Sequence, residues 1–422
     1  MKKHKTLGLL LILTLVTSTI SMGCSKVQDK NVKSEPVTIE FWHNYDAGSG
    51  QVDVLNSLIK EFENANTDIK VKQVYLEWEA LKNNVISGAA TGTLPDVLRG
   101  DIAFVPQFQD LNVLEEMGAL QDYSSIASKL LTAPNSTAKM GDKFYGLASN
   151  TNTKILFYNK QLLNDANVKV PNSLDELWAA AENVSNSKVI GMCEPWTGVW
   201  NIGPYIWSEG GDVLSPDNST AEGYINSPIA IKVIQQLADL YKVKALAGPS
   251  LDPGATGDTD GWASGVYALQ LDGPWREKSN IEAKVDYDAI QLPAGSKGSI
   301  SVLGGEDFMM FKTSDAAKKD ASWKFIKFMT DKNAQVQMAK VGQMPVNIEA
   351  LSDAESIKAI PLLPVFSKAL ETAKSRPVTA KWGEMEGIIA TKVSEAITGN
   401  KDVKIALDEA AQEIDKLILE GK

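Results

Sequence analysis

Strand-like and helix-like segments alternate along the first hundred residues of this chain, and that order limits the folds it can adopt. Val37–Trp42 and Ile69–Leu76 alternate apolar with polar residues, as half-buried strands do. Between them, apolar residues recur every three or four positions from 54 to 62, which predicts a helix. Leu94–Leu98 indicates a further short, buried strand. Strands joined by helices in this way pair in parallel beneath a cover of helices, so the fold class is α/β.

The same kinds of element continue to the end of the chain. Lys154–Tyr158 and Glu306–Lys312 are predicted strands, so the chain contains more than one sheet. Capping residues and apolar periodicity predict further helices over 174–184, 228–242, 316–330 and 403–419. Trp178 and Trp323 lie on the apolar faces of two of these helices and are expected in the core.

The N-terminus has the pattern of an export signal. Three lysines within the first five residues precede an uncharged apolar run over 7–20, which is shorter than the ~20 residues needed to span a bilayer core. The Gly-Cys ending at Cys24 resembles a bacterial lipobox, although Ser21 stands where such motifs usually carry leucine. We therefore expect 1–23 to be a lipoprotein signal peptide, Cys24 to be lipidated, and 24–36 to be a flexible tether. The alternative is a plain secretory signal with an incidental cysteine.

The cysteines, histidines and charges exclude several functions. If Cys24 carries the anchor, Cys193 is the one remaining cysteine and no disulfide can form within the chain. His43 is the one histidine after the signal, so zinc sites built on several His or Cys residues are excluded. The net charge is −11 and no cluster of Lys and Arg stands out, so nucleic acid is not expected as a partner. No phosphate-binding or dinucleotide-binding glycine motif occurs, and neither a cofactor nor a metal is expected.

The ten tryptophans offer binding chemistry, because several of them adjoin carboxylates or amides. Such a group suits a sugar, whose C–H face stacks on an indole while polar side chains bind its hydroxyls. Core packing of each indole is the competing interpretation. The candidate groups are Trp42-His43-Asn44-Tyr45-Asp46, Glu194-Pro195-Trp196 with Trp200, Asp272-Gly273-Pro274-Trp275, and the weaker Trp78 and Trp382-Gly383-Glu384.

Paired carboxylates leave glycoside hydrolysis open as well. That reaction needs an acid and a second carboxylate about 5–10 Å apart. The sequence does not supply the distance for any pair, and carboxylates also serve sugar-binding sites simply as hydrogen-bond acceptors. The candidates are Glu194, Glu306, Asp307 and Glu384.

Short segments follow one fixed order through nearly the whole chain after the signal: IEFWHN, SLIKEFENANTDIKV, GTLPDVLRGD, KFYGLASNTNTKILFYNKQLL, VPNSLDELWAAAENV, CEPW, SEGGDV, YINSP, WASGVYALQLDGPW, IQLPAG, LGGEDFMMFK, ASWKFIKFMTD and RPVTAKW. This order resembles that of the family 1 extracellular solute-binding proteins, the maltose-binding-protein-like group that serves ABC importers. The resemblance implies a fold of two α/β lobes with the ligand in the cleft between them. Chain crossings would lie near 148–153, 301–307 and 345–350. The two lobes would comprise 37–149 plus 305–346, and 152–302 plus 348–422.

The resemblance also implies roles for particular residues. Asp101 would bind a sugar hydroxyl, Glu194 would accept one, and Trp196 and Trp275 would stack on sugar rings. Asn152 stands where maltose-binding proteins place a glutamate, which implies a different ligand or hydroxyl. With the groups above, the candidate ligand-binding residues are Trp42, His43, Asn44, Asp46, Trp78, Asp101, Asn152, Glu194, Trp196, Trp275, Glu306, Trp382 and Glu384.

The expected function is capture of a di- or oligosaccharide for a membrane permease of the ABC type. The protein would be a monomer that is not an enzyme, held by its lipid anchor alone on the outer face of the cytoplasmic membrane. Two alternatives remain. One is an exported glycoside hydrolase that uses Glu194 or Glu306; the other is a binding protein for a non-sugar solute such as a polyamine or a glycerol phosphate ester.

Overall fold

The computed structural model describes residues 35–251, 258–313 and 315–420. By their contacts, Pro36–Lys422 form one unit, which is built around two sheets. The expected signal peptide, Cys24 and nearly all of the expected tether lie outside the described residues. In the part of the chain that is described, no helix has the length and apolar character needed to cross a bilayer.

The first sheet has the strand order β13-β12-β3-β1-β2, and β6 also pairs with β12. β1 pairs in parallel with β2 and β3, as the alternating order of strands and helices predicts, whereas β12 is antiparallel to β3 and β6. Its strands are β1 Val37–His43, β2 Ile69–Tyr75, β3 Val97–Asp101, β6 Leu147–Asn152, β12 Val302–Met310 and β13 Lys374–Ser375.

The second sheet has the order β11-β7-β10-β8-β9. β8 pairs in parallel with β9 and β10, and β7 pairs antiparallel with β10 and β11. Its strands are β7 Ile155–Asn159, β8 Ile190–Cys193, β9 Leu246–Ala247, β10 Tyr267–Asp272 and β11 Tyr287–Ile290. A small hairpin of β4 Lys139–Met140 and β5 Lys143–Phe144 stands apart.

Helices cover both faces of the first sheet. The alternation along β1 divides its side chains, so that Ile39 and Phe41 pack with one layer of helices and Trp42 with the other. The first layer includes α1 Gln51–Ala65, α4 Tyr123–Ala127, α12 Ala316–Met329 and α13 Lys332–Ala339. The second includes α2 Trp78–Thr91 and α3 Phe104–Asp110. Shorter elements nearby are η1 Met117–Ala119, α5 Thr132–Ser136 and α14 Ile348–Leu351.

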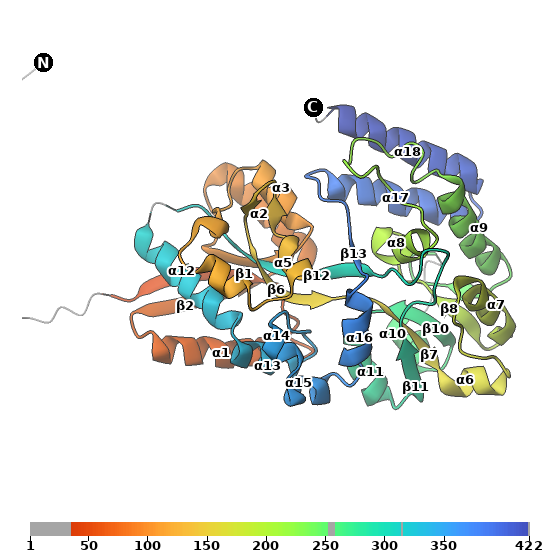
Figure 1. Ribbon diagram of the computed structural model, residues 1–422, viewed down its shortest axis with the longest axis horizontal. Helices are drawn as coiled ribbons and strands as arrows, with labels where there is room; N and C mark the ends of the chain where they lie inside the picture. Colours follow the sequence, from red (N-terminus) through yellow and green to blue (C-terminus); the bar gives the residue numbers. More distant parts are fainter. Residues whose placement is uncertain (1–34, 252–257, 314, 421–422) are drawn as a thin grey trace, which may run out of the picture. The chain divides into compact units, whose positions relative to one another are not determined.

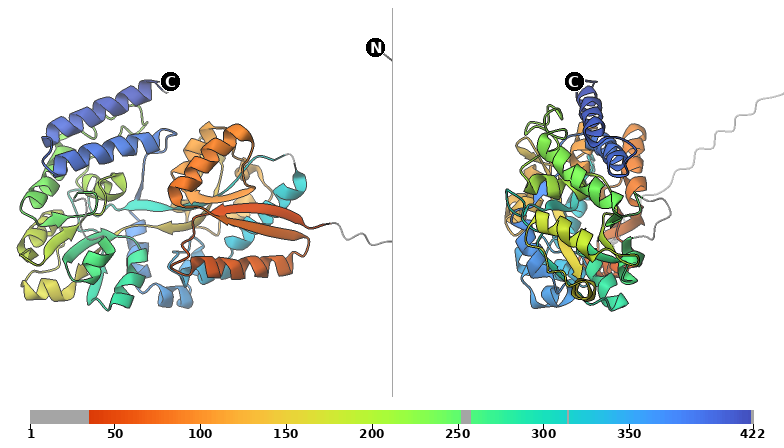
Figure 2. Two further views of the ribbon diagram at one scale, coloured as in Figure 1. Left: turned by 180° about the vertical axis from the view of Figure 1, so that it is seen from behind. Right: turned by 90° about the vertical axis from the view of Figure 1, so that its right-hand side faces the viewer.

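The second sheet is covered in the same way. Leu156 faces one cluster, while Ile155 and Phe157 face the other. The larger layer contains α6 Lys160–Asp165, α7 Leu174–Val184, α8 Val199–Ser208, α9 Pro228–Lys242, α17 Trp382–Ile397 and α18 Val403–Glu420. On the other side lie α10 Asp258–Ala263 and α16 Leu363–Leu370. The remaining helices are α11 Trp275–Ala283 and α15 Ala354–Ala359. The last two helices, α17 and α18, pack on each other and on α9 (Figure 2).

The chain passes between the two sheets along neighbouring strands. β6 belongs to the first sheet, and β7, which begins three residues after the end of β6, belongs to the second. β12 brings the chain back beside β6 (Figure 1). Gly304 of β12 pairs with Asn152 of β6. Each sheet with its helices is one lobe of a two-lobed α/β fold, here called the first and the second lobe.

Several local predictions are confirmed, while the bounds of some strands differ from those expected, most of all for β3 and β12. Trp178 and Trp323 are buried, as expected. The strand expected at 94–98 begins only at Val97, because Pro95 has no N–H to donate to a sheet, and it continues to Asp101. The strand expected at 306–312 begins four residues earlier, at Val302, because a pair of glycines interrupts the apolar pattern that would have revealed it.

Candidate functional site

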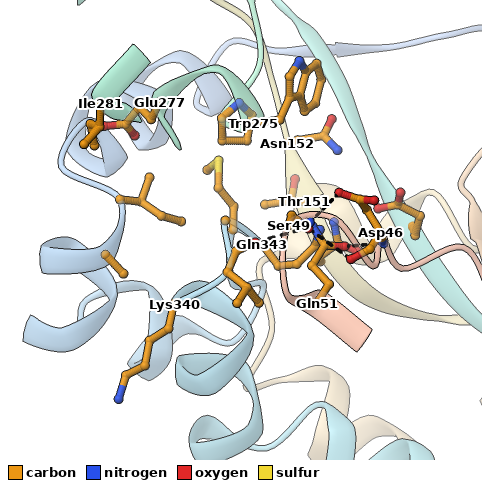
Figure 3. Close-up of a pocket in the computed structure, with 18 of the residues that line it drawn as sticks. Asp46, Ser49, Gln51, Thr151, Asn152, Trp275, Glu277, Ile281, Lys340 and Gln343 are labelled. Atoms are coloured by element: carbon orange, nitrogen blue, oxygen red, sulfur yellow. Dashed lines mark hydrogen bonds between the residues drawn. The ribbon is translucent and has the colours of Figure 1, made fainter. Parts of the chain in front are cut away.

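Two cavities adjoin at their shared lining residues Asn152, Trp275 and Glu306, and the two together are called the groove here. The indole chamber, of about 360 Å³, is lined by Trp78, Asp101, Asn152, Trp196, Trp200, Trp275, Gly304, Gly305, Glu306, Arg376 and Glu386. The side chamber has about 500 Å³. Besides the three shared residues, its lining includes Asp46, Ser49, Gln51, Thr151, Glu277, Ile281, Gln343, Met344 and Ile360 (Figure 3). Both lobes contribute to the walls of this groove.

Three neighbouring strands of the first sheet supply polar residues to the groove. Asp101 ends β3, Asn152 ends β6, and Glu306 lies in β12 between them. The register sets Glu306 opposite Asp101 and Gly304 opposite Asn152. Sheet pairing therefore fixes the spacing of these side chains.

Gly304 has a steric role at this point. A Cβ atom there would lie 2.2 Å from the Asn152 Oδ1 atom and 2.5 Å from the ring of Trp200. The absence of a side chain lets the indole of the second lobe approach the paired strands β6 and β12.

The four tryptophans of the indole chamber come from different elements. Trp78 begins α2, Trp196 follows β8, Trp200 lies in α8, and Trp275 begins α11. The rings of Trp200 and Trp275 have centroids 6.3 Å apart and planes inclined by 33°. Trp78, Trp196 and Trp275 are each more than a third exposed, unusually so for residues of this size. Exposed aromatic faces converging on one cavity suit a flat, partly apolar ligand.

A buried arginine, Arg99, holds several polar side chains of the first lobe in place at the groove. Arg99 of β3 donates to the side-chain oxygens of Asn44, Asn150 and Gln343 over 2.6, 2.9 and 2.8 Å. Its Nη2 atom also lies 2.9 Å from the Glu306 carboxylate. A carboxylate held by an arginine in this way can also accept hydrogen bonds from a ligand.

A second arginine, Arg376, likewise pairs with carboxylates of the groove, nearer the indoles. Arg376 donates to the Asp101 carboxylate over 2.7 Å and lies 3.9 Å from that of Glu386. Its guanidinium is 5.6 Å from the centroid of the Trp200 ring. Burial raises the pKa of Glu386, and the neighbouring Arg376 opposes that shift.

Glu277 is the unusual carboxyl of the side chamber. Its side chain is almost completely buried, and Oε1 accepts a hydrogen bond of 3.0 Å from the backbone N–H of Leu362. Burial raises the pKa of Glu277 to about 7. In Figure 3, Glu277 and Ile281 of α11 lie on one side of the chamber, with Asp46, Ser49 and Gln51 on the opposite side.

The structure brings seven of the thirteen candidate residues to the groove. They are Asp46, Trp78, Asp101, Asn152, Trp196, Trp275 and Glu306. The other six line neither chamber. They are Trp42, His43, Asn44, Glu194, Trp382 and Glu384.

Three of these six residues lie in or directly after the first strand, β1, and the strand places them away from the groove. Trp42 lies within β1, and the alternation of side chains along this strand packs its indole against the cluster beneath α2, where the indole N–H donates to Glu40 over 2.7 Å. His43 is buried beside Gln73, and burial lowers its pKa to about 4. Asn44 does not line the groove itself but accepts a hydrogen bond from Arg99, which pairs with the lining residue Glu306.

The remaining three also have structural partners. Glu194 is buried and accepts hydrogen bonds from Asn201, over 2.6 Å, and from Tyr205, while burial raises its pKa to about 6. The Trp382 indole is buried in the core of the second lobe. Glu384, at the protein surface, pairs with Lys381 at 3.3 Å.

The candidate list omitted Trp200, Arg376, Glu386, Glu277 and Gln343. Trp200 is part of a candidate group in the sequence, beside Trp196 and one helical turn away, but it is not in the final list of candidate residues. Arg376 and Glu386 become partners of Asp101 only through the fold, because about 275 residues separate Arg376 from Asp101 in the chain.

The four carboxylates named for the hydrolase alternative do not all reach the groove. Of Glu194, Glu306, Asp307 and Glu384, only Glu306 lines it. Asp307 is fully buried on the other face of β12, where Thr137 donates to it over 3.2 Å, and burial raises its pKa. Within the described residues, no group of three or more His, Cys, Asp or Glu side chains is placed to bind a metal ion.

Comparison with known proteins agrees with this architecture. The multiple sugar-binding protein of Streptococcus mutans is 24% identical over 385 residues, covering 86% of this chain and 87% of that protein. The galactooligosaccharide-binding protein of Bacillus subtilis is 22% identical over an alignment that covers 98% of this chain and 97% of that protein.

Solved structures share the fold. A substrate-binding protein of Listeria monocytogenes in complex with cycloalternan has a TM-score of 0.82 at 21% identity, covering 91% of this chain and 99% of that one. The GacH receptor of Streptomyces glaucescens, solved without ligand and with acarbose, has a TM-score of 0.79 at 24% identity, with the same coverage. A sequence model of the bacterial extracellular solute-binding proteins matches residues 57–365. That match extends over most of the chain, which therefore belongs to the bacterial extracellular solute-binding protein family.

Proposed function

We propose that this protein captures a di- or oligosaccharide in the groove and delivers it to the permease of an ABC importer. The observation that carries the proposal is the indole chamber, where four tryptophan rings surround carboxylates that arginines hold in place. Indoles stack on the C–H faces of sugar rings, while the side-chain oxygens of Asp101, Asn152 and Glu306 accept hydrogen bonds from the sugar hydroxyls. Relatives are named for binding multiple sugars and galactooligosaccharides, which supports the same ligand class.

Capture follows from the placement of the contacts on two lobes. A ligand first binds the walls of one lobe, and the other lobe then closes over it. Contacts made to both lobes at once exist only in the closed state, so the ligand shifts the population toward that state. The closed form is the one that a permease would distinguish from the empty protein.

Lobe boundaries remain part of the proposal. The expected limits are 37–149 plus 305–346 and 152–302 plus 348–422, and the change of sheet between β6 and β7 supports the first crossing, near 148–153. The third crossing is better placed after α14, because α14 packs on α13 whereas α16 packs on β7.

The protein would act as a monomer on the outer face of the cytoplasmic membrane, tethered through a lipidated Cys24 after removal of 1–23. A tether of this kind raises the effective concentration of the binding protein near its permease. Several acyl chains are needed for stable anchoring, since a single chain holds only reversibly.

The test is calorimetric titration with a panel of oligosaccharides, followed by chromatography of the incubated mixture. The proposal expects saturable binding of at least one oligosaccharide and its recovery intact. Shortened products would support a hydrolase instead. Heat only with a polyamine or a glycerol phosphate ester would indicate a non-sugar solute.

A further inference from the structure

The side chamber adjoins the indole chamber. Asn152, Trp275 and Glu306 line both, so a molecule stacked on Trp275 lies at the boundary between the two. Binding sites for small molecules typically occupy about 300–1,000 Å³. With about 360 and 500 Å³, each chamber is large enough to be a site by itself. The groove as a whole is larger than a ligand confined to the indoles would need.

The walls of the side chamber carry both kinds of contact that a sugar uses. Asp46, Gln51 and Gln343 are polar groups on the side of the first lobe. The side-chain amide of Gln343 is held in place, because its Oε1 accepts from the buried Arg99 over 2.8 Å. On the side of α11, Ile281 presents an aliphatic surface.

Ile281 is unusually exposed to solvent for an apolar side chain of its size. Its side chain is 54% exposed, although the neighbouring chamber residues Met344 and Ile360 are almost fully buried. A branched apolar side chain at the rim of a polar cavity gains dispersion contacts and loses water when a ligand covers it.

One helix links the two chambers. α11 carries Trp275 at its first residue and Ile281 near its end. The hydrogen bond from the N–H of Leu362 to Glu277 connects this helix to the chain that leads into α16. The stacking surface and the aliphatic surface therefore keep a fixed spacing, as two subsites for one extended ligand require.

We propose that the bound saccharide passes Trp275 and continues into the side chamber, where its end packs against Ile281, so that the protein prefers chains longer than a disaccharide. This inference rests on the proposed function. It adds a length preference and assigns that preference to the side chamber.

The test compares Ile281→Ala with a matched control, Ile405→Ala. Ile405 is also 54% exposed, but it lies on α18 and lines neither chamber. Malto-, galacto- and xylo-oligosaccharides of two to five units are titrated into the wild-type protein and both variants by calorimetry. Both substitutions are of exposed helical residues by alanine, so both variants should fold, and their melting temperatures confirm it.

In the series that binds, the wild-type affinity should rise at least about tenfold from two to four units. Ile281→Ala should reduce that increase to less than about threefold with little change for the disaccharide, and Ile405→Ala should leave it intact. Equal affinity for all lengths in the wild type, or an undiminished increase in Ile281→Ala, overturns the inference while saccharide binding stands. Absence of binding in every series overturns the proposed function and the inference together.

Discussion

Arg376 donates a 2.7 Å hydrogen bond to Asp101 and thereby joins the segment after β13 to the end of β3. The same guanidinium lies 3.9 Å from the Glu386 carboxylate and 5.6 Å from the Trp200 ring centroid. One buried cation thus holds two carboxylates of the groove beside an indole. A site arranged in this way presents acceptors to a ligand without an uncompensated buried charge.

Replacing Arg376 by methionine should destabilise the protein, because Asp101 and Glu386 lose their cation. Breaking a buried pair from one side costs about 3–5 kcal/mol. Urea denaturation followed by circular dichroism measures the loss. Lys381→Met is the control, since its pair with Glu384 is exposed and such pairs contribute at most about 1 kcal/mol. Equal, small losses in the two variants would show that the Arg376 network contributes little.

Trp275→Ala should weaken saccharide binding at least about tenfold, because Trp275 lines both chambers and its stacking surface is lost. The indole is about half exposed, so the substitution should leave the fold intact. Trp42→Phe is the control, because Trp42 lines neither chamber, and its affinity should equal that of the wild type. Calorimetric titration measures both. Unaltered affinity in Trp275→Ala would remove this indole from the site.

The raised pKa of the buried Glu277 carboxyl should make the stability of the protein depend on pH. Burial raises the pKa of Glu277 from an ordinary value of 4.5 to about 7, so the folded protein binds more protons than the unfolded chain between these values. The contribution of Glu277 to stability is therefore complete below about pH 4.5 and is lost as the pH rises through about 7.

Glu277→Gln should accordingly gain stability relative to the wild type on going from pH 4 to pH 8, by roughly 1–3 kcal/mol. Denaturation midpoints across that range measure the gain. Glu384→Gln, at the protein surface, is the reference substitution and should give no comparable trend. A constant difference between Glu277→Gln and the wild type at every pH would contradict the raised pKa.

The lipid anchor is tested in cells of the source organism or another bacterium that processes lipoproteins. The full-length chain should incorporate radiolabelled palmitate and sediment with membranes, and Cys24→Ala should do neither. Cys193→Ala provides the control, because Cys193 is buried in the second lobe. Label retained in Cys24→Ala would contradict anchoring through this cysteine.

Local patterns in the sequence predicted the elements better than the site. Ser173 and Ser227 accept hydrogen bonds from Glu176 and Ala230 at the helix starts that their capping patterns indicated. Such signals depend on residues only a few positions apart, so the sequence displays them directly.

The site depends on long-range pairing, which the sequence does not display. The motif around Trp42 was expected at the end of a strand, but β1 runs on to His43, and alternation along β1 turns Trp42 toward the cluster beneath α2 and buries His43 on the other face. Glu194 forms a motif with Trp196, yet Glu194 is buried with Asn201 and Tyr205 while Trp196 lines the groove. Arg376 is distant from Asp101 in sequence and joins it only when β13 pairs with β12.

The most direct measurement of the central claim is calorimetric titration of the purified protein with oligosaccharides, with chromatography of the same samples afterwards. The account predicts one saturable site with an affinity near micromolar, about 8 kcal/mol, and a saccharide that is recovered unchanged. No heat from any oligosaccharide in the panel, or the appearance of shorter products, would contradict it.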